Sequence, residues 1–262
     1  MAPKTARTRQ RPLVVVTNDD GIHAPGIRAL ARALTALAEV VVVAPETEQS
    51  STSHALTLSR PLRLREAEPG WYSLDGTPAD CVYVAAHHKS LCPRAPTLVV
   101  SGINMGSNLG SDVFYSGTVA GAREGSLRGV PSIAFSMPSD GDARACARRA
   151  ATIVSRMLAW RVRNPRAVAL VNVNFPRGAA KGTRVTSLGV RQYDDLVEIR
   201  HDPRGRQYLW IGGPGVKHPR MPGTDTDAFE RGFVSITPLR LDLYEPTGNE
   251  LASMLAGARK AP

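Results

Sequence analysis

A pair of neighbouring carboxylates follows an apolar, strand-like run at residues 13–16, in the sequence Asn18-Asp19-Asp20-Gly21. Adjacent carboxylates repel each other, and a hard divalent cation such as Mg²⁺ or Mn²⁺, bound through oxygen, offsets that repulsion. The alternative is an Asx turn in which Asp20 caps the next helix. The four residues alone leave both interpretations open.

A second polar cluster follows the apolar run at residues 40–44. It reads PETEQSSTSHALT and includes Ser50, Ser51, Thr52, Ser53 and His54. Hydroxyls that follow a strand can ligate a metal or contact phosphate oxygens. The alternative is a solvated Ser/Thr loop with an ordinary surface histidine. The position after a strand is what makes this loop a candidate site.

The third cluster, at residues 99–125, reads VVSGINMGSNLGSDVFYSGTVAGAREG. Its glycines allow the backbone to approach a ligand, and Ser116-Gly117-Thr118 supplies hydroxyl and N–H donors at the start of a helix. This pattern is typical of a phosphate cradle. The alternative is a Gly-rich loop that leads into a conventional N-cap. Because the P-loop and G-x-G-x-x-G patterns are absent, binding of ATP or a dinucleotide is disfavoured.

The elements that must position these clusters alternate between strand and helix periods. We expect strands at 13–18, 40–44, 97–102, 132–136 and 168–175, and helices at 27–37, 78–87, 119–127 and 143–160. This alternation predicts a Rossmann-like, doubly wound α/β fold with a mostly parallel sheet. In such folds ligands bind outside the carboxyl ends of the strands, where all three clusters lie.

The sequence pattern changes after about residue 176, where short β-type runs are separated by Gly, Pro and Asp clusters. We expect a basic, disordered tail at 1–12 and a single domain at 13–262, with a β-rich extension and oligomerisation segment at about 177–250. The apolar residues Tyr208, Leu209 and Trp210 either form a subunit interface or pack in an ordinary hairpin.

Composition restricts the class of protein. The chain has 262 residues, 42% of them hydrophobic, and no apolar run long enough to span a membrane. No signal peptide is evident, and the three cysteines lack C-x-x-C spacing, so we expect a cytoplasmic protein with reduced thiols. The net charge of +10 favours anionic partners, but aromatic residues make up only 5% and RNP-type motifs are absent. Nucleic-acid binding is therefore not expected.

The three clusters together supply what hydrolysis of a phosphomonoester needs. A divalent cation can polarise the phosphoryl group and activate water, while N–H and hydroxyl donors hold the transferring group. No G-x-S-x-G elbow and no cysteine in a nucleophilic setting are present, which disfavours acyl transfer. The sequence therefore predicts direct attack by a metal-bound water.

Six segments occur in the order and spacing of one known family: TNDDGIHAPGI, APETEQSSTSHALT, DGTPADCV, VSGINMGSN, YSGTVAGAREG and GTDTDAFERGFVSITPL. From about residue 13 to 244 the chain resembles the SurE family of metal-dependent 5′/3′-nucleotidases, some of which also degrade short polyphosphate. The resemblance implies a Rossmann-like core with a protruding β-hairpin and a C-terminal segment exchanged between subunits. It also implies a nucleoside monophosphate substrate and self-association to a dimer or a tetramer.

The resemblance implies one divalent cation per subunit, Mg²⁺ or Mn²⁺, held by Asp19, Asp20, Ser50 and Asn104. Of these, Asp19, Asp20 and Asn104 are the expected catalytic positions. Phosphate contacts would come from Asn108, Ser116, Gly117 and Thr118, and Asn18 would orient the aspartates. His23, Ala24 and Ala120 depart from the family pattern only at positions that carry no expected ligand.

We therefore expect a phosphomonoesterase that hydrolyses nucleoside 5′- or 3′-monophosphates. The alternatives are an exopolyphosphatase, which would use the same site residues, a non-catalytic nucleotide-binding regulator, and a basic nucleic-acid-binding protein. No motif identifies the group that protonates the leaving alkoxide. From the position of its loop, we hypothesise that His54 does so.

Overall fold

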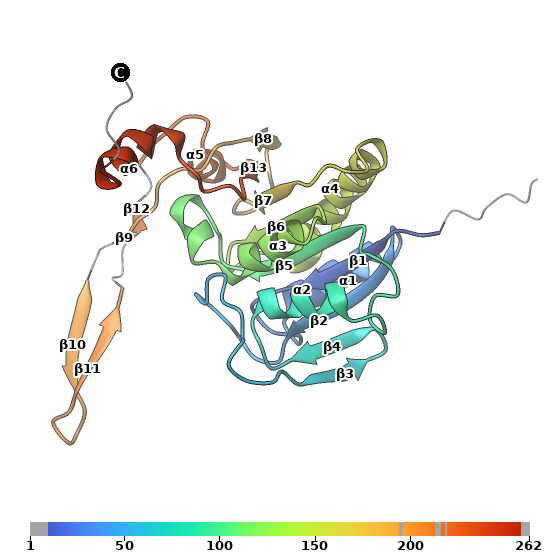
Figure 1. Ribbon diagram of the computed structural model, residues 1–262, viewed down its shortest axis with the longest axis horizontal. Helices are drawn as coiled ribbons and strands as arrows, with labels where there is room; N and C mark the ends of the chain where they lie inside the picture. The colour runs from blue at the N-terminus through green and yellow to red at the C-terminus, as the bar shows by residue number, and fades with distance from the viewer. Residues whose placement is uncertain (1–9, 194–195, 213–215, 218, 258–262) are drawn as a thin grey trace, which may run out of the picture.

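A nine-stranded sheet forms the centre of the computed structural model, which describes residues 10–193, 196–212, 216–217 and 219–257 (Figure 1). The strand order is β3-β4-β2-β1-β5-β6-β7-β13-β8. All neighbouring pairs from β4 to β7 are parallel, whereas β3 and β13 run antiparallel to β4 and β7. The strands span Leu13–Thr17 (β1), Glu39–Pro45 (β2), Leu64–Glu68 (β3), Trp71–Leu74 (β4), Leu98–Met105 (β5), Ser132–Met137 (β6), Leu170–Asn174 (β7), Thr183–Val185 (β8) and Val234–Leu239 (β13).

Helices cover both faces of this sheet. Helices α1 (Pro25–Leu34) and α4 (Ala143–Arg163) pack against each other on one face, and α2 (Pro78–His87) and α3 (Gly117–Leu127) pack against each other on the opposite face. Strand β1 shows how the sequence specifies two layers: Val14 and Val16 belong to the core beneath α1 and α4, while Leu13 and Val15 belong to the core beneath α2. The predicted doubly wound α/β fold is confirmed.

The helix boundaries follow local signals in the sequence. Pro25 opens α1, and its Ile27, Leu30 and Leu34 are all buried at helical spacing. Helix α2 begins with a capping box between Thr77 and Asp80. The expected helix at 119–127 begins two residues earlier in the structure, because the hydroxyl of Ser116 accepts a hydrogen bond from the Val119 N–H and acts as its N-cap.

Several elements were not predicted. Strand β3 has mostly exposed residues and no alternation of polar and apolar side chains, so periodicity does not identify it. Strand β4, the helices α5 (Asp225–Glu230) and α6 (Asn249–Leu255), and the 3₁₀ turns η1 (Gly110–Phe114) and η2 (Pro246–Gly248) are short, and short elements give weak periodic signals.

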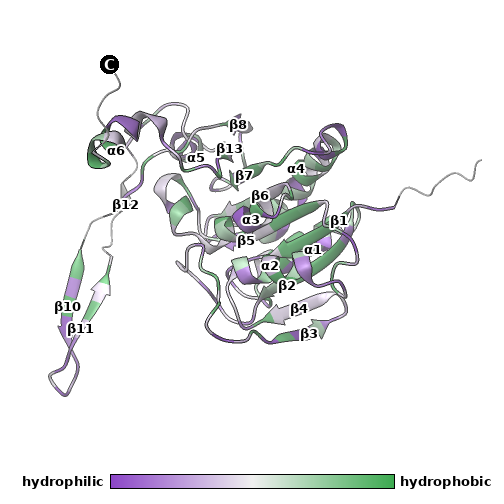
Figure 2. Cartoon of the chain, in the orientation of Figure 1, coloured by the Kyte–Doolittle hydropathy of each residue, from purple (hydrophilic) through white to green (hydrophobic). Residues whose placement is uncertain are grey.

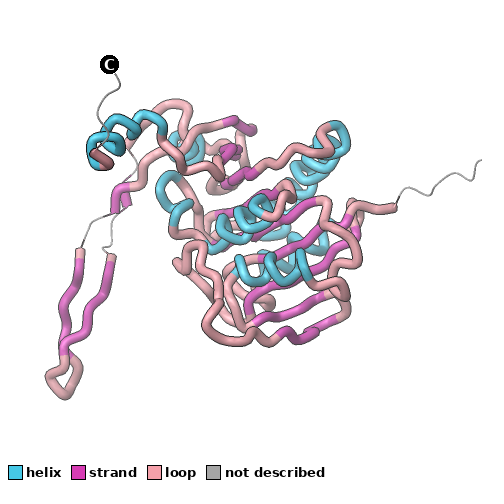
Figure 3. Tube along the Cα trace, viewed as in Figure 1, coloured by secondary structure: helices cyan, strands magenta, loops and turns pink. Residues whose placement is uncertain are grey.

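The β-type runs after residue 176 form strands in two places. Strands β8 and β13 join the central sheet, while β10 (Val197–His201) and β11 (Gln207–Ile211) form a hairpin that projects away from it (Figure 3). Two short strands, β9 (Gln192–Tyr193) and β12 (Val216–Lys217), pair with each other at the base of the hairpin.

The hairpin strands contain apolar residues (Figure 2), and several of their side chains are exposed. Val197 pairs with Ile211, and Ile199 pairs with Leu209, on one face of the hairpin. These side chains and Trp210 are between 55% and 92% exposed. Exposed apolar strands of this kind are typical of association sites. The expected dimer or tetramer stays a prediction.

Three further expectations concern the chain as a whole. Within the described residues no helix is both long and apolar enough to cross a membrane. All three cysteines are free thiols. Residues 1–9 of the expected basic tail lie outside the described residues, and residues 10–12 have no helix or strand.

The order of the strands locates the functional edge of the sheet. Strand β1 lies between β2 and β5, so the chain turns to one side after β1 and later returns on the other side. Such a reversal leaves a crevice at the carboxyl ends of the two strands. Asp19 and Asp20 follow β1, while Asn104 lies at the end of β5, so both polar clusters face the crevice.

Candidate functional site

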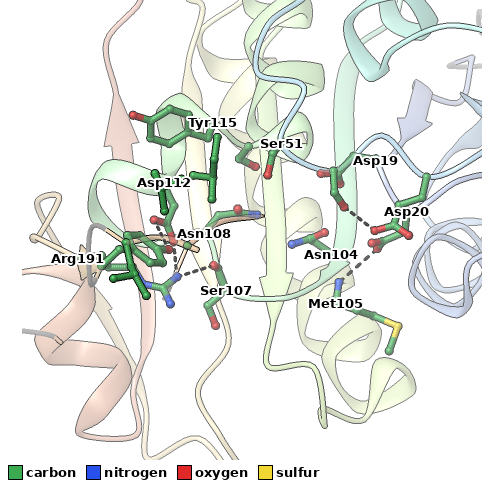
Figure 4. A pocket seen from close by; sticks show the side chains of 18 residues that line it. Asp19, Asp20, Ser51, Asn104, Met105, Ser107, Asn108, Asp112, Tyr115 and Arg191 are labelled. Carbon is green, nitrogen blue, oxygen red and sulfur yellow. Dashed lines mark hydrogen bonds and ion pairs between the residues drawn. The ribbon is translucent and has the colours of Figure 1, made fainter. Parts of the chain in front are cut away.

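A pocket with a volume of about 750 Å³ occupies this crevice (Figure 4). Residues from three expected clusters and from the base of the hairpin line it: Asp19, Asp20, Glu48, Ser50, Ser51, Asn104, Met105, Ser107, Asn108, Asp112, Tyr115, Ser116, Arg191, Tyr193, Leu196, Val197, Ile211 and Gly212. Six of the eight predicted site residues are therefore brought together. Gly117 and Thr118 are not among the lining residues.

Gly117 and Thr118 instead pack behind Asp19. The hydroxyl of Thr118 is fully buried and donates a hydrogen bond to Oδ1 of Asp19. A Cβ atom at Gly117 would lie 2.8 Å from Cβ of Asp19 and 3.0 Å from its Oδ2, which is too close for a side chain. The first turn of α3 therefore fixes the position of the Asp19 carboxylate.

Asp20 is held from strand β5. Its Oδ2 accepts a hydrogen bond from the backbone N–H of Met105 at 3.2 Å (Figure 4). The side chain is only partly buried, and the pKa of its carboxyl is raised, first by burial and then by the negative charge of Glu48. Asp20 thus presents a carboxylate to the pocket while one of its oxygens stays anchored to β5.

Burial raises the pKa of Asp19 to about 6, and the charge of Asp20 adds to this effect, although the hydrogen bond from Thr118 opposes it. A carboxyl group is costly to ionise when it has lost its hydration and has a like charge beside it. The protein therefore holds two carboxylates in a setting that penalises their charge, and a bound cation would remove that penalty.

The neighbouring ligand candidates present oxygen atoms. The side-chain N–H of Asn104 donates to the carbonyl of Gly106 at 2.6 Å, which leaves Oδ1 of Asn104 available. The hydroxyl of Ser50 donates to Glu48 at 2.6 Å and keeps its lone pairs. Asn18 is fully buried and donates to the Gly21 carbonyl at 2.8 Å, which fixes the turn that carries both aspartates.

This donor set fits a hard divalent cation. Asp19, Asp20, Ser50 and Asn104 all line one pocket and offer only oxygen, which Mg²⁺ and Mn²⁺ prefer. Over the described ranges, no group of three or more His, Cys, Asp or Glu side chains suits a metal ion. A site for Zn²⁺ built from nitrogen and sulfur ligands is therefore disfavoured in this part of the chain.

Asn108 is held by a buried amide network that sequence reasoning missed. Its Nδ2 donates to the hydroxyl of Ser136, and its backbone carbonyl accepts from the side chains of Asn172 and Asn174. Asn174 also accepts from the Asn108 backbone N–H at 2.8 Å. The available signal was the pattern VNVN in β7, which places two asparagines on one face of a buried strand.

The end of the pocket beside the hairpin is lined by an ion pair, a tyrosine and apolar side chains. Arg191 donates to the carboxylate of Asp112 and to the Ser107 carbonyl, and the hydroxyl of Tyr193 donates to Asp112 at 2.7 Å. Leu196, Val197 and Ile211 line the same end. Arg191 and Tyr193 were not predicted, because they lie about 80 positions from Asp112 in the sequence and in a segment without a recognisable motif.

Asp19→Asn should stabilise the metal-free protein. Above about pH 6 the wild-type carboxylate is ionised in a buried site, whereas below the unfolded pKa of about 4 it is protonated in both states. The destabilisation therefore develops as the pH rises between these values. With a chelator at pH 7.5, we expect the variant to unfold with a free energy about 1–3 kcal/mol higher than that of the wild type, and the difference should vanish near pH 4. Denaturant unfolding of both proteins at the two pH values measures this, and a less stable variant at pH 7.5 would contradict it.

Comparison with known proteins agrees with this geometry. A family model described as "Survival protein SurE" matches residues 14–195. A protein of Sorangium cellulosum named "5'-nucleotidase SurE" is 51% identical over 250 residues, which cover 94% of this chain and 96% of the relative. A protein of Deinococcus radiodurans with the same name is 47% identical over 256 residues, which cover 92% of each chain.

Solved structures give the same result. The structure titled "Crystal Structure of Sure Protein from Aquifex aeolicus" superimposes with a TM-score of 0.80 at 38% sequence identity and covers 94% of this chain and 100% of that one. The family match spans more than half of the chain, and the relatives are matched over nearly their whole length. The chain therefore belongs to the SurE family.

Proposed function

We propose that this protein is a divalent-metal-dependent nucleotidase that hydrolyses nucleoside 5′-monophosphates, and also 3′-monophosphates, to nucleoside and phosphate. The observation that carries the proposal is the pair Asp19 and Asp20 at one end of a pocket whose other end carries a tyrosine ring and apolar side chains beside the Arg191–Asp112 ion pair. Relatives named "5'-nucleotidase SurE", matched over most of their length, support the 5′-nucleotidase part of this proposal.

The cation would be held by Asp19, Asp20, Ser50 and Asn104. All four residues line the pocket, and each has a side-chain oxygen that can act as a ligand. When bound, it would neutralise charge on the phosphoryl group and lower the pKa of water. The protein supplies the fixed geometry: Thr118 and Gly117 position Asp19, and the Met105 N–H positions Asp20.

Phosphate oxygens would be bound by Asn108 and Ser116. Asn108 uses one N–H of its amide on Ser136 and keeps the second for a ligand. The Ser116 oxygen accepts from Val119, so its O–H remains free to donate into the pocket. Donors held in place by the surrounding network need no reorganisation when charge develops on the transferring group. In the reaction, water forms a bond to phosphorus as the bond to the nucleoside oxygen breaks, and that oxygen takes up a proton.

The hairpin end of the pocket favours a nucleotide over inorganic polyphosphate as the main substrate. Tyr193, Leu196 and Val197 offer a ring and apolar carbon atoms. A base and a ribose can pack on these groups, whereas a chain of phosphates makes no favourable contact with them. The cation at this end, Arg191, is already paired with Asp112. We therefore expect a nucleoside to be the leaving group.

The test is phosphate release from a panel of substrates: nucleoside 5′- and 3′-monophosphates, ribose 5-phosphate and a short polyphosphate. Each is assayed with chelator and with added Mg²⁺ or Mn²⁺. The proposal predicts activity that chelator removes, that the cation restores and that is greatest with nucleotides. Tight binding of nucleotides without phosphate release would support a binding regulator instead, and faster hydrolysis of polyphosphate would support an exopolyphosphatase.

A further inference from the structure

The loop that carries Ser50 has no regular structure of its own. It leads from β2 to β3, and Ser51 and Ser53 adopt backbone φ angles of 58° and 54°. This left-handed region is uncommon for residues other than glycine, so surrounding contacts must hold the loop in shape. The contacts that hold it therefore decide where the Ser50 hydroxyl lies in the pocket.

Helix α2 and the turn before α3 supply part of this support. The backbone N–H and the hydroxyl of Thr57 donate to the two oxygens of the buried Asp80, at 2.8 and 2.6 Å. Ser53 donates through its backbone N–H to the Tyr115 carbonyl at 3.0 Å and through its hydroxyl to the Phe114 carbonyl at 2.6 Å.

His54 connects the Ser50 loop directly to helix α3. Its Nε2 lies 2.8 Å from Oε2 of Glu124, whose side chain is 1% exposed. The other carboxylate oxygen of Glu124 lies 3.0 Å from Nε of Arg128. His54 is not among the residues that line the pocket, so its contact with the buried Glu124 lies outside the pocket.

Helix α3 is thus a common support for two of the candidate ligands. Its first turn fixes Asp19 through Gly117 and Thr118, and Glu124, two turns further on, fixes the Ser50 loop through His54. A buried carboxylate oxygen strongly favours a retained hydrogen-bond donor, because a buried polar atom without a partner is costly. The His54–Glu124 contact therefore couples the loop to the same rigid element that orients Asp19.

We infer that His54 is a positioning residue that holds the Ser50 loop in its ligand-ready conformation through Glu124, and that it is not the proton donor of the reaction. This inference rests on the proposed metal site. It replaces the hypothesis that His54 protonates the leaving group. Partners that orient metal ligands typically change metal affinity by about 10- to 100-fold when they are removed.

The test compares His54→Gln with His54→Asn, which differ by one methylene. The amide nitrogen of glutamine reaches the position of the His Nε2 atom and can donate to Glu124, whereas that of asparagine is too short. Mn²⁺ binding is followed by electron paramagnetic resonance of the free ion. We expect His54→Asn to weaken Mn²⁺ binding by about 10- to 100-fold, His54→Gln to stay within about threefold of the wild type, and both to keep near wild-type kcat at saturating Mn²⁺. His201→Ala, on the exposed hairpin strand β10, is the control.

Equal Mn²⁺ affinity in His54→Asn and the wild type would overturn the inference. So would a large loss of kcat in both variants at saturating Mn²⁺, since this result would make His54 the proton donor. Hydrogen exchange of the backbone amides at residues 50–53 gives a readout without metal: exchange should be faster in His54→Asn and unchanged in His54→Gln. If the wild type bound no Mn²⁺, the proposed function would fail while this exchange experiment would still decide the role of His54.

Discussion

Asp20→Asn is expected to lower kcat/KM for a nucleoside 5′-monophosphate by about 1000-fold, which corresponds to about 4 kcal/mol of transition-state stabilisation. In the protein, Oδ2 of Asp20 accepts from the Met105 N–H. Asparagine would keep its oxygen on that donor and turn its NH₂ group toward the pocket. The variant therefore replaces a negative oxygen ligand by a group that cannot bind a cation, with almost no change in volume.

The matched control for this variant is Asp140→Asn. Asp140 is an exposed carboxylate in the turn between β6 and α4, and it lines a different pocket. Both variants remove one negative charge, so a general electrostatic effect would appear in both. We expect Asp140→Asn to stay within about twofold of the wild type, as exposed positions away from a site usually do. Steady-state kinetics at saturating Mg²⁺ measure both, and retention of a tenth or more of the wild-type kcat/KM in Asp20→Asn would contradict the assignment.

Gly117→Ala is expected to have the second large effect, a loss of about 100-fold in kcat/KM. The added Cβ would meet Cβ and Oδ2 of Asp19 at 2.8 and 3.0 Å, so Asp19 must shift. Alanine is a better helix former than glycine by about 1 kcal/mol, so helix propensity would not explain a loss. The displacement of one carboxylate is therefore the expected cause.

A glycine with open space around it controls for the substitution itself. Gly248 precedes α6, and a Cβ there would meet no atom within 4 Å among the described residues. We expect Gly248→Ala to retain wild-type kinetics. Circular dichroism should show both variants folded. Full activity of Gly117→Ala would mean that the position of Asp19 is not critical for the reaction.

The sequence predicted the central fold because β1, β2, β5 and β6 are mostly buried and each contains a run of apolar residues. The alternation of such runs with helical periods was enough to predict a parallel sheet. It was also enough to place the polar clusters at one edge, since the carboxyl ends of parallel strands share that edge. Strand β3 escaped prediction because four of its five residues are exposed.

Within the candidate site, the sequence identified ligands that directly follow strands but not the groups that support them. Thr118 was expected to contact phosphate, whereas the structure places its hydroxyl on Asp19, 99 positions earlier in the chain. The contact of Arg191 with Asp112 also joins distant segments. Such pairs depend on how helices and loops pack across the sheet, which local patterns do not encode.

The most direct test of the central claim is a titration of the chelator-treated protein with Mn²⁺, in which bound ion and phosphate release from a nucleoside 5′-monophosphate are measured in the same samples. The proposal predicts one bound Mn²⁺ per chain and a rise in activity that follows occupancy of that site, with both signals lost in Asp20→Asn. Full activity in the absence of any bound ion, or binding that persists unchanged in Asp20→Asn, would contradict a metal-dependent nucleotidase centred on Asp19 and Asp20.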